Sequence, residues 1–394
     1  QMAQPWFQVR HLQRTAGLTA LSANFELYGD MSNRMMTLAA AYAPRQEIYS
    51  IDECFLDFAG VRGPLAPRGR ELRAQVLQWT GLPTSVGFAT TKTLAKLANH
   101  VAKMAERKPG SYPRQLAQVC NFAELAPAQL EAVMQATDVG EVWGIGRKTS
   151  ARLREGGIRT VLDVIRADPL ALRQQFNVVL ERTVRELRGE PCQAVDEVPE
   201  ANQQIMCSRS FGEPVTSLAS LTESVSGFAA RVAHKLRAQR SVAGAVQVFL
   251  STSPFRQQDR QHSPSATLPL KPPTADTRQL AAAATRALEA MFRSGYRYVK
   301  AGVVLVDLQP QGHAQVLDQP DLFGELTPQP AERRDRTRLM QAMDALNTRF
   351  GQGAVAVASG ARPARRPAPA HAARQEQRSP RYTTRLDEVV RVGA

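Results

Sequence analysis

Residues 47–58, with the sequence EIYSIDECFLDF, place two adjacent carboxylates inside a run of apolar and β-favouring residues. The composition predicts extended structure, which Asp52 and Glu53 interrupt. Burying two neighbouring carboxylates is unfavourable unless a counter-charge compensates them. Carboxylate oxygens suit Mg²⁺ or Mn²⁺, and these cations keep coordination positions open for a substrate phosphate. The stretch therefore predicts the metal site of a phosphoryl-transfer enzyme; the alternative is a hairpin tip whose acids simply face water.

The net charge narrows the class of partner. The 394 residues include 50 lysines and arginines against 36 acids, giving a net charge of +14. A chain of this length holds two to four domains, and this charge favours a polyanion, with nucleic acid ahead of a membrane surface. No apolar run approaches about 18 residues and no signal peptide opens the chain, so we expect a soluble, intracellular protein without a membrane partner.

The cysteines and histidines do not form a metal-binding pattern. The cysteines, at positions Cys54, Cys120, Cys192 and Cys207, lack the spacing of metal ligands, and the six histidines are scattered. We expect reduced thiols and no zinc site.

The first 46 residues predict a helix. Asp30 is expected to cap it, and Pro44 lies near its expected end. Its apolar stripe would comprise Met31, Met35, Leu38 and Tyr42. The chain begins at Gln1 rather than at Met, and we interpret it as a fragment.

A strand followed directly by a lysine-bearing helix comes next. Residues 83–89 predict the strand, and residues 90–107 predict the helix, with Thr90 as its cap. Lys92, Lys96 and Lys103 share one face of this helix. The helix N-terminus together with the lysines predicts an anion site, whereas the alternative is a lysine face that is merely solvated.

A glycine turn with adjacent cations lies in a helical region, in the sequence VWGIGRK at residues 142–148. Gly144 and Gly146 permit positive φ and let backbone amides point outward, and Arg147 and Lys148 add positive charge. The pattern is typical of a helix-hairpin-helix that holds a DNA backbone without reading its sequence. A plain turn between two helices is the alternative.

Residues 203–310 predict a split βαβ unit. Its expected elements are strands at 205–211, 245–251, 266–270 and 298–308 and helices at 221–240 and 276–293. A Ser220 to Glu223 capping box would begin the first helix. This fold serves many functions, so it indicates none by itself. Arg209 is a candidate phosphate contact, and a solvent-facing arginine is an equal alternative.

The C-terminal region contains a candidate partner-binding peptide, QPDLF at residues 319–323. Leu322 and Phe323 form an apolar anchor in a polar segment, and Gln319 supplies a directional hydrogen bond. An amphipathic helix is expected at 332–350, and the segment 361–378, rich in Ala, Pro and Arg, predicts disorder.

Several separate blocks of this chain resemble the Y-family translesion DNA polymerases, and in particular their UmuC branch. The blocks are SIDECFLD at 50–57, LSANFELYGDMSNRM at 21–35, TKTLAKLANH at 91–100, FNVVLERTVRELRGEPC at 176–192 and SPRYTTR at 379–385. Cys54 stands where the family usually has a small residue such as Ala. The resemblance implies an α/β multidomain protein with right-hand polymerase architecture.

The resemblance also implies a division into domains. These are partial fingers and palm at 1–46, a palm with the carboxylate hairpin at 47–115, a helical thumb at 116–192, a linker at 193–202, a little finger at 203–310 and a UmuC-type tail at 311–394.

The implied reaction is template-directed nucleotidyl transfer on damaged DNA, as in the error-prone synthesis of the SOS response. A primer 3′-hydroxyl would attack the α-phosphate of a deoxynucleoside triphosphate, with two Mg²⁺ ions expected as cofactors. Asp52 and Glu53 would bind these metals, with Lys96, and less strongly Lys92, contacting the triphosphate. The peptide at 319–323 resembles the clamp-binding peptide of bacterial polymerases. This clamp peptide would bind the sliding clamp. A UmuD-type subunit and RecA are further implied partners, in the bacterial cytoplasm at the nucleoid.

Two other functions stay open. By the same resemblance, an opening segment with a first metal-binding Asp, an aromatic steric gate and a triphosphate-contacting Arg is absent. We therefore expect the 394 residues alone to be poorly active, and the alternative is a catalytically incomplete DNA- and clamp-binding remnant. A nucleotidyl cyclase also uses a two-carboxylate palm, but it needs neither the glycine turn, the split βαβ unit nor the clamp peptide.

Overall fold

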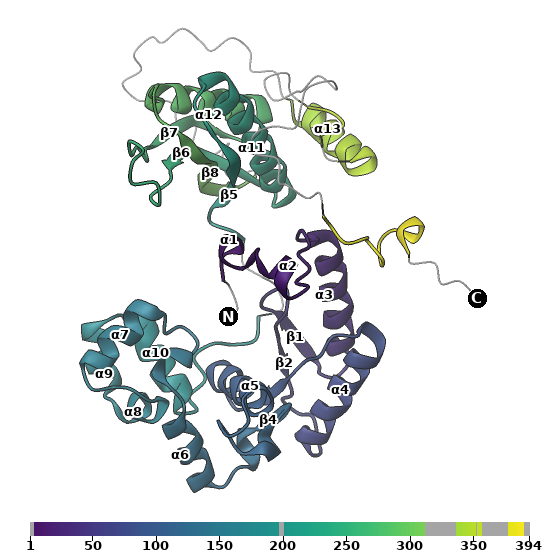
Figure 1. Cartoon of the computed structure of the whole chain (residues 1–394), viewed down its shortest axis with the longest axis vertical. Coiled ribbons are helices and arrows are strands. Elements are labelled where there is room, and N and C mark those ends of the chain that lie inside the picture. The colour runs from purple at the N-terminus through teal and green to yellow at the C-terminus, as the bar shows by residue number, and fades with distance from the viewer. Residues whose placement is uncertain (1–3, 197–200, 312–335, 352, 357–376, 390–394) are drawn as a thin grey trace. The chain divides into compact units, whose positions relative to one another are not determined.

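The computed structural model describes residues 4–196, 201–311, 336–351, 353–356 and 377–389, which divide into two compact units (Figure 1). Unit 1 comprises Gln1–Pro199 together with Gln377–Ala394, and unit 2 comprises Glu200–Glu376. Each unit has hydrophobic cores of its own. The chain thus leaves unit 1, builds unit 2 and returns to unit 1 at its C-terminal end.

Unit 1 opens with helices and a β-hairpin. Its first elements are α1 Trp6–Val9, α2 Leu12–Thr15, α3 Phe25–Ala40, β1 Arg45–Ile48, β2 Cys54–Asp57 and α4 Leu65–Thr80. The prediction that Asp30 caps α3 is wrong: Asn24 is the cap, and its side chain accepts from the Leu27 amide at 3.4 Å. Asp30 lies one turn inside the helix, where it pairs with Arg34 at 2.7 Å.

The hairpin confirms that Asp52 and Glu53 interrupt the extended structure. β1 and β2 pair antiparallel, with Ile48 opposite Cys54, so residues 49–53 form the connecting loop. The carboxylates of Asp52 and Glu53 therefore lie at the tip. Met35 and Met36 of α3 pack with α4 beneath this hairpin.

A small parallel sheet places the lysine helix. Its elements are β3 Val86–Phe88, α5 Lys92–Arg107 and β4 Val119–Asn121, and β4 pairs parallel with β3. The cap of α5 is Thr91 rather than Thr90, because the Thr91 side chain accepts from the Leu94 amide at 3.3 Å. A Cβ atom at Gly87 would lie 2.2 Å from the Asn99 backbone nitrogen, so glycine alone allows β3 to approach α5 this closely.

The remainder of the first part of unit 1 is helical. Its elements are η1 Arg114–Leu116, η2 Phe122–Glu124, α6 Pro127–Ala136, η3 Val139–Glu141, α7 Arg147–Glu155, α8 Val161–Arg166, α9 Pro169–Gln175 and α10 Val178–Leu187. One hydrophobic core joins α5 to these helices, with Leu97 and Val101 of α5 packed into the same cluster as Val142 and Ile145.

Unit 2 has the predicted β-α-β-β-α-β order. Its elements are β5 Ile205–Val215, α11 Leu218–Ala238, β6 Ser241–Thr252, β7 Ser265–Thr274, α12 Thr277–Met291 and β8 Tyr298–Pro310. The antiparallel sheet has the order β5-β8-β6-β7. The predicted capping box is wrong, because Ser217 caps α11 by accepting from the Ser220 amide at 3.3 Å.

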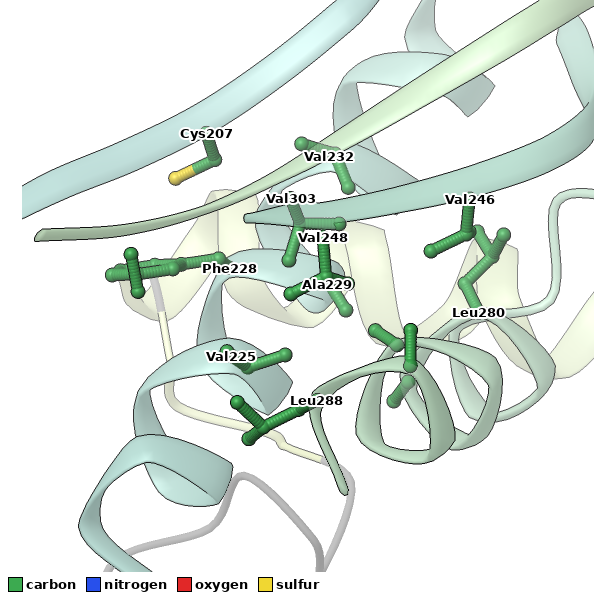
Figure 2. Packing of buried hydrophobic residues seen from close by; sticks show 14 of the residues in the cluster. Cys207, Val225, Phe228, Ala229, Val232, Val246, Val248, Leu280, Leu288 and Val303 are labelled. Carbon is green, nitrogen blue, oxygen red and sulfur yellow. The ribbon is translucent and has the colours of Figure 1, made fainter. Parts of the chain in front are cut away.

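The core of unit 2 lies between the sheet and its two helices. Figure 2 shows Phe228 of α11 and Leu288 of α12 on the helical side, with Val248 of β6 and Val303 of β8 on the sheet side. All four side chains are fully buried. Buried and half-buried residues alternate along β6 from Ala245 to Thr252, which is why the period-two pattern in the sequence predicted this strand.

The C-terminal region is described at residues 336–351, 353–356 and 377–389. Helix α13 Thr337–Phe350 belongs to unit 2, where Met340 is buried. Residues 377–389 belong to unit 1 and include η6 Leu386–Glu388. The predicted clamp peptide at 319–323 and most of the segment predicted to be disordered lie outside the described residues. Among the described ranges we find no helix whose length and apolar character would let it span a membrane.

Candidate active site

The tip of the β1–β2 hairpin holds Asp52 and Glu53 in a fixed loop. The amides of Tyr49 and Ser50 both donate to the Glu53 carbonyl, at 3.1 and 3.0 Å. The Ser50 hydroxyl donates to Asp52 Oδ1 at 2.7 Å, and it accepts from the Asp52 amide at 3.3 Å. Asp52 is exposed and Glu53 half-buried. The loop therefore presents two adjacent carboxylates toward solvent on an ordered backbone.

Helix α5 brings a lysine to one of these acids. Lys96 Nζ lies 2.8 Å from Glu53 Oε2, with side-chain exposures of 20% for the lysine and 42% for the glutamate. The same ammonium lies 4.6 Å from the ring centroid of Tyr49 and 5.5 Å from that of Trp143. Aromatic faces attract a cation, so the lysine is bounded by a carboxylate and two rings. The structure thus brings together three predicted residues, Asp52, Glu53 and Lys96.

Lys92 lies one helical turn earlier in a more buried place. Its side chain is 9% exposed and forms an ion pair with Glu47 of β1. Glu47 Oε2 also accepts from the Asp196 amide at 2.7 Å, and the Lys92 ammonium lies 5.1 Å from the Phe55 ring centroid. Reaching a triphosphate would require Lys92 to leave this buried pair.

The N-terminus of α5 is not an open anion site, which corrects the sequence prediction. Glu186 of α10 has no exposed surface, and its Oε2 accepts from the Thr93 amide at 3.0 Å. Its Oε1 accepts from the amides of Cys192 and Gln193 at 2.8 and 3.1 Å. A carboxylate of the chain itself therefore occupies the positive end of the helix dipole. Sequence reasoning missed Glu186 because it lies 93 residues from Thr93 in the chain.

An aromatic cluster, which sequence reasoning also missed, joins the hairpin to the glycine turn. The ring centroid of Tyr49 lies 5.8 Å from that of Phe55 and 5.3 Å from that of Trp143. Trp143 Nε1 donates to the Tyr49 hydroxyl at 2.9 Å. The only local signal was a tryptophan directly before the first glycine. The cluster fixes the turn against the loop that carries the carboxylates.

The predicted glycine turn has the expected outward backbone. Gly144 has φ of 88°, whereas Gly146 has φ of −79° and caps α7, so only the first glycine needs positive φ. Both glycines, Arg147 and Lys148 are exposed, while the intervening Ile145 is 4% exposed and packs into the core. An apolar side chain therefore anchors the turn while its amides and two cations face outward.

The other predicted site residues are Arg209, in unit 2, and the clamp-binding residues of the C-terminal region. Arg209 is exposed on β5, an edge strand of unit 2, and its Nη1 donates to the Ser208 carbonyl at 3.4 Å. Gln319, Leu322 and Phe323 lie outside the described residues.

The two hairpin acids fit a hard divalent cation. Mg²⁺ is commonly held by one or two carboxylates, with substrate phosphates and water completing its octahedral coordination. Asp52 and Glu53 supply two such carboxylates on an exposed loop. Within the described ranges, no group of three or more His, Cys, Asp or Glu side chains lies close enough to bind a metal.

Three families match parts of the chain. Residues 1–100 match the impB/mucB/samB family, and residues 202–317 match the C-terminal domain of that family. Residues 337–392 match a family described as a domain of unknown function, DUF4113.

Relatives of known name match almost the whole chain. Protein UmuC of Salmonella typhimurium is 41% identical over 391 residues, which cover 99% of this chain and 87% of the relative. Protein MucB of Escherichia coli is 41% identical over 88% of this chain and 79% of its own length. DNA polymerase IV 1 of Mesorhizobium japonicum is 26% identical over 90% of this chain and 74% of its own.

A solved structure shares the fold. A Y-family DNA polymerase chimera of Dbh and Dpo4 superposes with a TM-score of 0.59 at 18% sequence identity, covering 77% of this chain and 82% of the chimera.

Proposed function

Because the chain belongs to the impB/mucB/samB family, the UmuC-type branch of the Y-family DNA polymerases, we propose that its carboxylate hairpin serves template-directed nucleotidyl transfer. The function is that of an error-prone translesion polymerase subunit in SOS mutagenesis. The observation that carries the catalytic assignment is the ordered loop that holds the exposed Asp52 and the half-buried Glu53 beside Lys96.

In this proposal Asp52 and Glu53 hold Mg²⁺, with two ions expected. When bound, Mg²⁺ lowers the pKa of an attacking hydroxyl and offsets charge on the leaving phosphate oxygens. The protein contributes position: the hydrogen bond from Ser50 orients Asp52, and the carbonyl of Glu53 is fixed by two amides. Such positioning is a large part of catalysis in phosphoryl transfer.

Lys96 is proposed to contact the triphosphate. It is paired with Glu53 here, and a cation bound by that carboxylate would compete with this pair. The ammonium would then turn toward the phosphates while the rings of Tyr49 and Trp143 keep it near the hairpin. Lys92, in its buried pair with Glu47, is the weaker candidate.

The glycine turn is proposed to hold the DNA backbone. Gly144 and Gly146 leave the backbone open, and the first-turn amides of α7 with Arg147 and Lys148 give a positive surface for phosphate. Arg209 is proposed as an additional phosphate contact from unit 2. These contacts carry no base information, which suits synthesis on damaged templates.

We base the proposed domain division and partners on the resemblance to the family. We propose a palm at 47–115, a thumb at 116–192 and a little finger at 203–310, with β4 of the next segment completing the palm sheet beside β3. Gln319, Leu322 and Phe323 are proposed to bind the sliding clamp, and a UmuD-type subunit and RecA are proposed partners. Replacing both Leu322 and Phe323 with Ala should abolish clamp binding and leave DNA binding unchanged.

Primer extension tests the proposal. We expect the protein expressed from its intact gene to add deoxynucleotides to a primed template, including one with an abasic site, only when Mg²⁺ or Mn²⁺ is present. Glu53→Gln should remove extension, while Glu71→Gln, an exposed acid on α4, should not. DNA binding without extension would instead support the non-catalytic remnant, and formation of a cyclic nucleotide would support the cyclase.

A further inference from the structure

The C-terminal peptide, residues 377–389, is seated on the start of helix α3. Ser22 and Arg378 form a parallel β-bridge, and the Ser22 amide donates to the Gln377 carbonyl at 2.9 Å. The two segments are more than 350 residues apart in the chain. The peptide lies in the C-terminal part of the domain of unknown function at 337–392.

A buried asparagine is the centre of this contact. Asn24 has no exposed surface, and its side-chain oxygen caps α3. Its Nδ2 donates to the Ser379 carbonyl at 2.9 Å and to the Pro380 carbonyl at 3.3 Å. A buried amide whose oxygen and nitrogen are both engaged specifies its partner closely, because an unmatched polar group would be costly there. The start of α3 is therefore shaped for this peptide.

Ion pairs hold the peptide beyond Asn24. Arg381 Nη1 lies 3.1 Å from Glu26 Oε2 in the first turn of α3, and its Nη2 lies 2.7 Å from Glu388 Oε1 within the peptide. The hydrogen bonds that the side chain and the amide of Arg381 donate to Glu388 lower the pKa of that carboxyl to about 2. Leu386 is 90% exposed, so the peptide docks by polar groups and leaves an apolar side chain facing solvent.

Helix α13, which belongs to the same domain of unknown function, is anchored in unit 2. Asp344 of α13 accepts two hydrogen bonds from Arg237 of α11, each 2.7 Å long, and lies 3.1 Å from His234 Nδ1. Arg237 also donates to the Ala275 carbonyl at 2.8 Å. This bidentate, partly buried pair is the stronger of the two anchors, since Arg381 and Glu26 are more open to water.

We propose that the domain of unknown function is an intramolecular tether, in which α13 anchors to unit 2 and the C-terminal peptide is the ligand of a polar docking site at the start of α3. Its second anchor is releasable, because it depends on hydrogen bonds and partly exposed charges rather than on a hydrophobic core. A partner protein that binds residues 379–388 must therefore compete with α3. Helix α3, which carries the docking site, also contacts the carboxylate hairpin. It packs against β2, and the Met36 carbonyl accepts from the Gln46 side chain of β1 at 2.9 Å.

Amide hydrogen exchange tests this inference on the full chain. The amide of Ser22 is protected only while the Gln377 carbonyl accepts from it, so the proteolytic fragment that carries Ser22 reports docking. Asn24→Asp keeps a favourable helix cap but places a carboxylate against the Ser379 and Pro380 carbonyls. We expect exchange at Ser22 to become about tenfold faster or more, with Met35 and Met36 in α3 still protected. Raising the salt concentration from about 0.05 M to about 0.5 M should act in the same direction.

Two further variants serve as a control and as an independent test. Asn177 caps α10 by accepting from the Leu180 amide at 3.0 Å, so Asn177→Asp changes a cap without touching the peptide and should leave Ser22 protected. Arg381→Ala alters no residue of α3 and should also speed exchange at Ser22, but by less than Asn24→Asp does, because the pair of Arg381 with Glu26 is partly exposed. Unchanged exchange at Ser22 in the Arg381→Ala protein would overturn the proposal, even if Asn24→Asp loosened the helix.

Discussion

Two lysine–glutamate pairs, one helical turn apart on α5, have the same chemistry but different surroundings. The inner pair is Lys92 with Glu47, and the outer pair is Lys96 with Glu53. Both lysines lie near aromatic rings, at 5.1 Å from Phe55 for the inner one and 4.6 Å from Tyr49 for the outer one. The lysine and glutamate side chains of the inner pair are 9% and 17% exposed, whereas those of the outer pair are 20% and 42% exposed.

The difference teaches that burial, not pairing, separates a structural ion pair from one available for function. Breaking a buried pair leaves a charge without a partner, at a cost of about 3 to 5 kcal/mol. Exposed pairs contribute about 0 to 1 kcal/mol. The outer pair can therefore exchange its partner for a cation or a phosphate at small cost, and the inner pair cannot.

The largest expected effect separates the two lysines by stability. Lys92→Met leaves the Glu47 carboxylate buried without its ion-pair partner and should lower the free energy of unfolding by about 3 kcal/mol or more, whereas Lys96→Met should lower it by less than about 1 kcal/mol. Urea unfolding of the two proteins measures this. Equal losses would remove the distinction between the pairs.

The next effect concerns the activity of the two hairpin acids, one of which belongs to the outer pair. Asp52→Asn and Glu53→Gln should each reduce primer extension at least about a hundredfold, while the fold is retained. Glu71→Gln is the control. Full activity in the Glu53→Gln protein would show that the outer pair is structural as well.

A smaller effect concerns the ring beside the outer lysine. Trp143→Phe keeps an aromatic ring but removes the hydrogen bond to the Tyr49 hydroxyl, which we expect to slow primer extension about fivefold, as the loss of about 1 kcal/mol would. Trp79, which is 65% exposed on α4, offers the matched change Trp79→Phe. If both variants slowed extension alike, the contact with Tyr49 would not matter for the outer pair.

The smallest effect is a pH dependence of the helix that carries both pairs. Burial lowers the pKa of His100 on α5, and Glu141 partly opposes this. The unfolded chain, with an ordinary histidine pKa of about 6.5, then binds a proton more readily than the folded one, so stability should fall as the pH drops below about 6.5. Urea unfolding at pH 7.5 and 5.5 should show a smaller loss for His100→Gln. An identical loss in both proteins would assign the pH dependence elsewhere.

Local patterns predicted much of the fold. The period-two alternation of Val246 and Val248 identified a strand, and the acids at 52 and 53 were correctly expected to interrupt extended structure. The resemblance to a polymerase family rested on short sequence motifs such as SIDECFLD at 50–57. The relatives confirm this resemblance.

Contacts between distant segments were beyond such patterns. Asp30 and Asn24 are both acceptable helix caps, and the choice between them involves a peptide near residue 380. Glu186 reads locally as one more acid on a helix, and its role at the start of α5 depends on how α10 packs. The pairing of β4 with β3 across more than 30 residues is of the same kind. Sequence patterns report the neighbours along the chain, whereas these features depend on neighbours in space.

The hydrophobic core shared by α5 and the helices around the glycine turn has a thermodynamic consequence. Leu97 and Val101 of α5 pack in one hydrophobic cluster with Val142 and Ile145 of the turn. The helix that carries Lys96 and the turn that carries the outward amides therefore share one core. If DNA at the turn raises the affinity of the site for a nucleotide, the nucleotide must raise the affinity for DNA by the same factor.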